Sequence, residues 1–332
     1  MATKKAVKKI TLTHIYDHYP LYKLIYGQPV PDRTRDVQEA VILTDVWLEN
    51  KNLGGHLVQD KRQGKIAPLT VLEMFSGSSS EHELEFRRQC HFPIHEYGLT
   101  DVVLHPDSDQ RMLIADLTAD PTPKEILDRQ ADYAVLLAFY YSGGSFLKES
   151  TIHDPTAALN RLMKNAATLC MYGGLFVLDI PENPYRGLYE NLIADDTDGD
   201  TVRELPIYSF NPLRASLGLP VVGGVCTLKY RLTNRVSRTR SLCIDTLDDI
   251  HVTYNEKVVA EFKIKEPFIQ VMFTEAEYCR AASNAGFKDF IFLGYSEDGG
   301  YEVNVDEWLD PVGKEDSIPD SMFATKIGFV RG

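Results

Sequence analysis

The chain has 332 residues, of which 44% are hydrophobic and 25% charged, and its formal net charge is −13. These proportions are typical of a globular protein long enough to bury a large core without disulfides. The acidic balance argues against a nucleic-acid partner, because such proteins present basic surfaces to phosphates.

Cysteine usage and hydropathy exclude further classes of protein. The five cysteines form no Cys-x-x-Cys pair, so the sequence predicts neither a zinc site nor a disulfide framework. This usage favours a reducing, cytoplasmic compartment. No apolar run reaches the ~18 residues that would predict a membrane span, so no membrane partner is expected.

The N-terminal region is predicted to be helical. Apolar residues recur at helical spacing between positions 37 and 48, and Gly54-Gly55 breaks the pattern. We therefore expect a helical cap over residues 1–60.

Residues 61–204 are predicted to form an α/β core. Helices are expected at 81–90 and 156–171, and Gly173-Gly174 is expected to end the second helix with a left-handed cap. The expected strands are short and apolar; they lie at 69–75, 97–103, 111–116, 131–138 and 175–179. Strands that alternate with helices through short connections predict a doubly wound, mostly parallel sheet.

The pattern changes to period two between residues 205 and 270, which predicts an antiparallel sheet with one solvated face. A capping box at Thr274 and Glu277 opens another helix, and the chain is expected to return to the core over residues 271–310. Residues 311–332 carry proline, glycine and charge, and are expected to form a loosely attached tail.

Several motifs occur in a fixed order along the predicted core. They are Glu73-x-x-x-Gly77-x-Ser79 after the first strand, Asp116 at the end of the third, Asp132 at the start of the fourth, and Gly173-Gly174 before the fifth. In this order the chain resembles the class I, S-adenosylmethionine-dependent methyltransferases. Tyr22-Lys-Leu-Ile-Tyr26 is similar to the family's N-terminal cap. The resemblance covers roughly residues 15–305 and implies a Rossmann-like core with an inserted antiparallel β lid.

The resemblance also implies a cofactor site for S-adenosylmethionine. Glu73 would take the ligand's amino group, Gly77 would let the backbone approach its methionine part, and Asp116 would accept a hydrogen bond from the adenine amine. Asp101 would clamp the ribose hydroxyls, with Glu96 as the alternative. The other residues expected to bind the cofactor are Ser79, Leu117, Ala138, Phe139 and Tyr22.

The implied activity is in-line methyl transfer to a small-molecule acceptor, in which most of the rate comes from positioning. The antiparallel region would cover the acceptor as a lid. No catalytic base is assigned, no metal site is expected, and a homodimer is left open. The alternative is a binding or scaffold protein on a catalytically degenerate methyltransferase fold, because Ser79 stands where the family has a second glycine.

Overall fold

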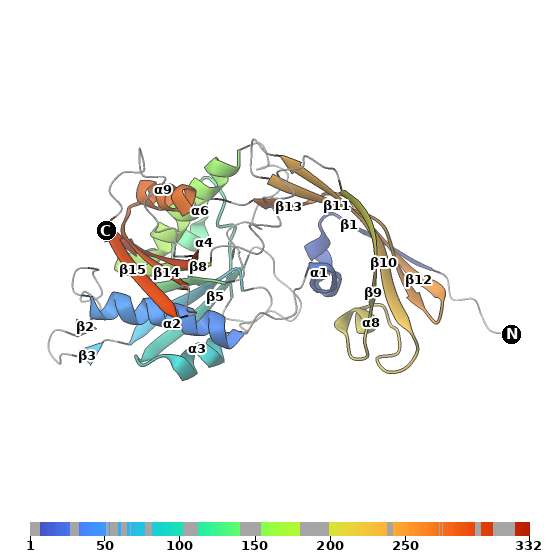
Figure 1. Ribbon diagram of the computed structural model, residues 1–332, viewed down its shortest axis with the longest axis horizontal. Helices are drawn as coiled ribbons and strands as arrows, with labels where there is room; N and C mark the ends of the chain where they lie inside the picture. The colour runs from blue at the N-terminus through green and yellow to red at the C-terminus, as the bar shows by residue number, and fades with distance from the viewer. Residues whose placement is uncertain are drawn as a thin grey trace. The chain divides into compact units, whose positions relative to one another are not determined.

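The computed structural model divides the chain into two compact units (Figure 1). Unit 1 comprises Met1–Pro31, Lys148–Ile152 and Tyr189–Val271, and unit 2 comprises Asp32–Leu147, His153–Leu188 and Met272–Gly332. The residues described are 7–26, 33–50, 53, 59–60, 65–66, 68–76, 82–101, 112–139, 154–179, 199–237, 242–271, 273, 275–295, 300–307 and 323–332.

Unit 2 is built on an eight-stranded sheet in the order β15-β14-β16-β8-β7-β4-β5-β6. Five of its strands run parallel to one another: β4 (Leu69–Met74), β5 (Ile94–Asp101), β6 (Met112–Ile114), β7 (Tyr133–Ala138) and β8 (Cys170–Asp179). Their spatial order is the 3-2-1-4-5 order of a doubly wound sheet, which reverses between β4 and β7. The predicted α/β class and mostly parallel core are confirmed by this arrangement.

The remaining strands of unit 2 are antiparallel to their neighbours. They are β14 (Phe287–Tyr295), β15 (Tyr301–Glu307) and β16 (Phe323–Arg331). β16 pairs with β8 on one side and β14 on the other, and its Ile327 and Phe329 are fully buried. The expectation of a loosely attached tail is therefore wrong for residues 323–331. Their alternating apolar residues fill an interior position whose strand partners are distant in sequence.

Helices cover both faces of this sheet (Figure 1). One face carries α2 (Arg33–Glu49) and α3 (Glu83–Gln89); the other carries α4 (Lys124–Leu127), α6 (Pro155–Leu169) and α9 (Glu275–Ala285). A small pair, β2 (Gln59–Asp60) and β3 (Lys65–Ile66), is separate from the main sheet.

Gly173 and Gly174 have a different role from the predicted helix cap. Helix α6 ends at Leu169, and both glycines lie inside β8. Gly173 has a φ of 73°, and its carbonyl accepts a hydrogen bond of 2.9 Å from the indole Nε1 of Trp47. A Cβ at Gly174 would lie 2.8 Å from the Cys170 sulfur. The pair is thus required for close packing at the start of the strand.

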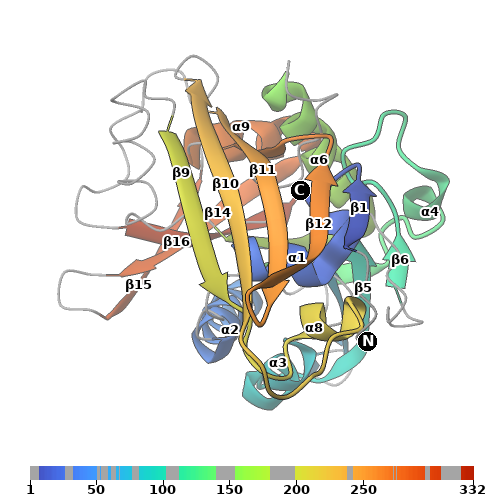
Figure 2. The same cartoon turned by 90° about the vertical axis from the view of Figure 1, so that its right-hand side faces the viewer.

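Unit 1 contains a six-stranded sheet in the order β1-β12-β11-β10-β9, with β13 also paired to β11 (Figure 2). Its strands are β1 (Lys8–Leu12), β9 (Gly199–Pro206), β10 (Cys226–Ser237), β11 (Leu242–Tyr254), β12 (Lys257–Ile264) and β13 (Phe268–Val271). All pairings are antiparallel except that of β1 with β12. The antiparallel region therefore begins before residue 205 and also recruits a strand from the N-terminal segment.

The helical elements of unit 1 share a core with its sheet. They are the 3-10 helix η1 (Ile15–His18), α1 (Tyr19–Tyr26) and α8 (Pro212–Ser216). The prediction of one helical cap over residues 1–60 is therefore wrong: Lys8–Leu12 is a strand, and α1 and α2 belong to different units. β1 could not be recognised locally because its partner, β12, lies about 250 residues away. Among the described residues, no helix is long and apolar enough to cross a membrane.

Candidate functional site

Three of the predicted acidic residues lie at or just beyond the carboxyl ends of three neighbouring parallel strands of unit 2. Glu73 is the penultimate residue of β4, Asp101 is the last residue of β5, and Asp116 lies two residues beyond β6. Because these strands are parallel, their carboxyl ends share one edge of the sheet. That edge is where open α/β sheets bind ligands, next to the point at which the strand order reverses.

The carboxylate of Glu73 is buried and held by two side chains. Its Oε1 lies 2.8 Å from Nδ1 of His82, and its Oε2 accepts a hydrogen bond of 2.8 Å from the Tyr97 hydroxyl. Burial of an unpaired carboxylate would be strongly unfavourable, so these partners allow the acid to occupy the interior. The paired register of Val71 with Tyr97 explains the second contact, since Val71 and Glu73 face the same side of β4.

The imidazole of His82 also stacks on the ring of Phe139. The ring centroids are 4.3 Å apart with an interplanar angle of 28°, and both residues are buried. Phe139 directly follows the last residue of β7, Ala138, which is itself buried. This stacking brings His82, the residue before α3, against Phe139 at the end of β7, where the strand order reverses.

Asp116 lies in a turn that is fixed by α6. Its Oδ1 accepts hydrogen bonds from the backbone N–H of Thr118 at 2.9 Å and from the Thr118 hydroxyl at 2.7 Å. The buried amide of Asn165 donates to the carbonyl oxygens of Leu117 at 2.8 Å and Ala119 at 3.2 Å. The side chain of Asn165 therefore sets the path of the backbone that carries the Asp116 carboxylate.

The other predicted site residues are placed as follows. Leu117 is buried beside Asp116 in the same turn. Tyr22 lies on α1 and belongs to unit 1. Glu96, the alternative ribose acid, is exposed in the first half of β5 and lies 3.9 Å from Arg129, so it is at the opposite end of the strand from Asp101. Gly77 and Ser79 lie outside the described residues.

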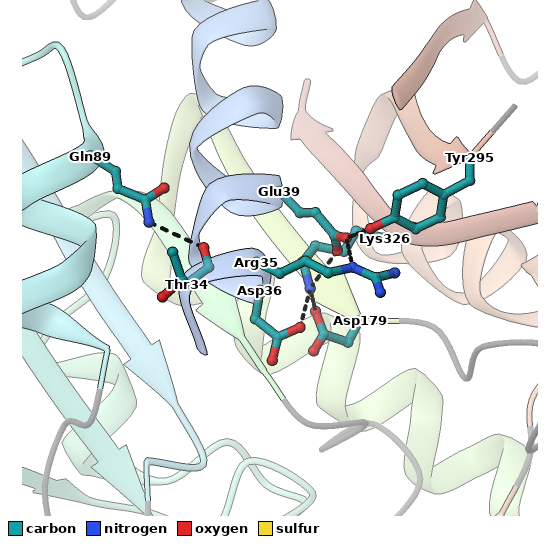
Figure 3. Close-up of polar contacts among 8 residues, drawn as sticks. All are labelled: Thr34, Arg35, Asp36, Glu39, Gln89, Asp179, Tyr295 and Lys326. Carbon is teal, nitrogen blue, oxygen red and sulfur yellow. Dashed lines mark hydrogen bonds and ion pairs between the residues drawn. The ribbon is translucent and has the colours of Figure 1, made fainter. Parts of the chain in front are cut away.

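A second polar cluster lies at the carboxyl end of β8 (Figure 3). The buried ammonium of Lys326 forms an ion pair with Asp179, the last residue of β8. It also lies 3.3 Å from Glu39 and 3.7 Å from Asp36, both on α2. The Tyr295 hydroxyl donates a hydrogen bond to Glu39. We call these five residues the Lys326 cluster.

Burial and charge act in opposite directions within this cluster. Burial disfavours the charged form of Lys326, but the carboxylates of Asp179, Glu39 and Asp36 outweigh it and raise the pKa of the ammonium. Burial raises the pKa of Asp36, against the opposing attraction of Lys326. Burial and the hydrogen bond to Glu39 raise the pKa of Tyr295.

The sequence did not identify the residues that organise these contacts. His82, Tyr97, Asn165 and Lys326 become informative only when strand register and helix packing are known. The one local signal belongs to Asn165, which is the polar exception on the buried apolar face of α6. Among the described residues, no group of three or more His, Cys, Asp or Glu side chains could hold a metal ion.

The sequence matches no protein-family model, and no curated protein is detectably similar to it. Solved structures with a similar backbone include DesVI of Streptomyces venezuelae, at 13% identity over 95% of this chain and 99% of that chain, with a TM-score of 0.45. A SAM-dependent methyltransferase from Methanosarcina mazei is 11% identical over 80% of this chain and 92% of that chain, with a TM-score of 0.35. Human N-acetylserotonin methyltransferase in complex with SAM is 12% identical over 94% of this chain and 62% of that chain, with a TM-score of 0.31.

The Asn165 contacts generate a prediction about stability. Asn165→Ala should lower the free energy of unfolding of unit 2 by roughly 1–3 kcal/mol, because two buried carbonyl oxygens lose their donor. Lys164→Ala, at the exposed neighbouring position on α6, is the matched control and should leave stability nearly unchanged. Chemical denaturation followed by circular dichroism measures both variants. Equal stability of the two variants would contradict the anchoring role of Asn165.

Proposed function

We propose that the chain is an S-adenosylmethionine-dependent methyltransferase that acts on a small molecule. The observation that carries the proposal is the alignment of Glu73, Asp101 and Asp116 along the carboxyl edge of three adjacent parallel strands. Carboxylates accept hydrogen bonds from ammonium, hydroxyl and amine groups, and S-adenosylmethionine presents these three groups in its methionine, ribose and adenine parts. The chemistry of the residues present therefore fits this ligand.

In the proposed reaction, the residues of the chain bind and orient. When bound, the cofactor supplies a methyl group on a sulfonium that is already a strong electrophile. Asp101 holds the ribose hydroxyls, and Asp116, with Leu117 beside it, holds the adenine. Ala138 and Phe139 form an apolar wall at the end of β7 that excludes water. The rate then depends on holding the acceptor's nucleophile in line with the methyl group.

Glu73 has a modified role in this proposal. Its two carboxylate oxygens already accept hydrogen bonds from His82 and Tyr97. Each oxygen has a second lone pair, so the ligand's amino group can be bound in addition or through water. The alternative function is a binding or scaffold protein whose fold no longer performs methyl transfer.

Binding of the cofactor is the first prediction of this proposal. Calorimetric titration with S-adenosylmethionine and with its demethylated product should give measurable heat with both ligands. The absence of heat and of any thermal shift at millimolar ligand would exclude the methyltransferase. Binding without methyl transfer to any component of a small-molecule extract would favour the alternative.

The adenine contact can be tested separately. Asp116→Ala should weaken cofactor binding by roughly 1–3 kcal/mol, because the buried adenine amine would lose its acceptor. Asp128→Ala removes the same charge from an exposed position at the end of α4 and should leave the affinity unchanged. Calorimetry on both folded variants provides the comparison. Unchanged affinity of Asp116→Ala would show that the adenine binds elsewhere.

We also propose that unit 1 serves as the lid over the acceptor. The chain leaves unit 2 after the carboxyl end of β8, which is the ligand edge of the sheet, and then forms β9. The antiparallel sheet of unit 1 has one apolar face, covered by α1 and α8. Within unit 1, the ring of Tyr22 packs against those of Tyr19, Tyr26 and Phe268.

Removal of the lid should separate turnover from cofactor binding. Because β1 pairs with β12, the deletion must take residues 1–31 together with Gly199–Val271, with a Gly-Ser linker in place of the second segment. The truncated protein should bind S-adenosylmethionine but transfer no labelled methyl group to a small-molecule extract. Loss of cofactor binding together with loss of the unit 2 fold would show instead that unit 1 supports the core.

A further inference from the structure

The buried ammonium of Lys326 lies beside the ring of Phe139, which follows the end of β7. Lys326 Nζ is 5.8 Å from the ring centroid of Phe139, within the range of a cation–π contact. The same ring stacks on His82, whose Nδ1 lies 2.8 Å from the Glu73 carboxylate. A continuous series of contacts therefore runs from β16, through the end of β7, to the end of β4.

We propose that Lys326 is a positioning residue for the cofactor site, which holds Phe139 and, through it, the pair formed by His82 and Glu73. This proposal rests on the proposed function. Lys326 acts by neutralising Asp179, Glu39 and Asp36 beside Phe139. It does not itself contact the reacting atoms.

The position of the cluster supports a role in the site. Asp179 ends β8, Phe139 follows the end of β7, and Glu73 lies near the end of β4, so all three are at the ligand edge. Lys326 is paired in register with Asp179, which fixes the ammonium at this edge. A requirement for stability alone would be met by apolar residues, because replacing buried ion pairs with well-packed apolar groups is often neutral or stabilising.

The charge balance explains why the ammonium is needed. The carboxylates of Asp36, Glu39 and Asp179 surround Lys326, and Arg35 lies 3.1 Å from Glu39. Arg35 is half-exposed, and its guanidinium lies 4.4 Å from the Tyr295 ring centroid. Without Lys326, the three carboxylates would repel one another where β8, α2 and Phe139 meet.

The experiment measures the position of His82 and the affinity for the cofactor independently. Lys326→Met removes the charge and keeps much of the volume, Lys326→Arg keeps the charge, and Lys164→Met is the exposed control on α6. The His82 imidazole resonances, assigned with His82→Gln, report the stacked Phe139 ring in the absence of cofactor. Titration calorimetry with S-adenosylmethionine reports the affinity.

Lys326→Met should displace the His82 resonances and weaken cofactor binding by roughly 10–100-fold, the size of effect expected when a buried polar group loses its partner. Lys326→Arg should have the His82 resonances and the cofactor affinity of the wild type, and Lys164→Met should change neither of these. Undisplaced His82 resonances in Lys326→Met would overturn the proposal. An equal displacement of the His82 resonances in Lys326→Arg would also overturn the proposal, because the positive charge at residue 326 would then not be the cause.

The pH dependence distinguishes electrostatic positioning from lost packing. In Lys326→Met, the pKa of Asp36 should rise, because the attraction of Lys326 no longer opposes burial and the repulsion of Glu39. Lowering the pH should then protonate Asp36, relieve the repulsion and return the affinity and the His82 resonances toward wild-type values. The charged groups that face Asp36 in both proteins are Glu39, Arg35 and His82, and the wild type over the same pH range provides the baseline. A pH profile parallel to that baseline would overturn the electrostatic role.

Two further comparisons make the result decisive. If Lys326→Met does not fold, the double variant Lys326→Met/Asp179→Asn is compared with the single variant Asp179→Asn. The His82 resonances are expected to be displaced between these two proteins. Absence of that displacement would overturn the proposal. Displaced resonances in a chain whose wild type binds no S-adenosylmethionine would exclude the proposed function while supporting the link between Lys326 and His82.

Discussion

The parallel pairing of β4 with β5 on one side and β7 on the other determines where the polar groups of unit 2 lie. Parallel strands end at the same edge, so residues that follow different strands come close together without being close in sequence. Glu73, Asp101, Asp116 and Phe139 are gathered in this way. The helices on both faces bury the strands themselves, and only the strand ends and the loops beyond them are left for binding.

Buried polar side chains stabilise this edge in specific positions. Glu73 is held by His82 and Tyr97, and the turn at Asp116 is held by Asn165. Each of these groups would be costly in the interior without its partner, so the alternatives to the observed geometry are disfavoured. Stability and the arrangement of the candidate site therefore depend on the same hydrogen bonds.

The sequence predicted the parts of the fold that have strong local patterns. β4, β7 and α6 lie where the apolar spacing indicated. β1 and β16 were missed, because their strand partners are distant in sequence. Within the candidate site, the sequence indicated the acidic residues at the carboxyl ends of the strands. It could not indicate Lys326 or Asn165, since their roles arise from residues brought together by the fold.

The division of the chain between the two units constrains the order in which they can fold. The backbone passes between units at residues 31, 147, 152, 188 and 271. β1 can pair only after β12 has been synthesised. The strand edges of β8 and β14 that pair with β16 stay unpaired until β16 has been synthesised. Such distant pairings slow folding and leave strand edges exposed during synthesis. A growing chain would therefore carry two unfinished sheets at once, and chaperone binding to the nascent protein would protect them from pairing with other chains.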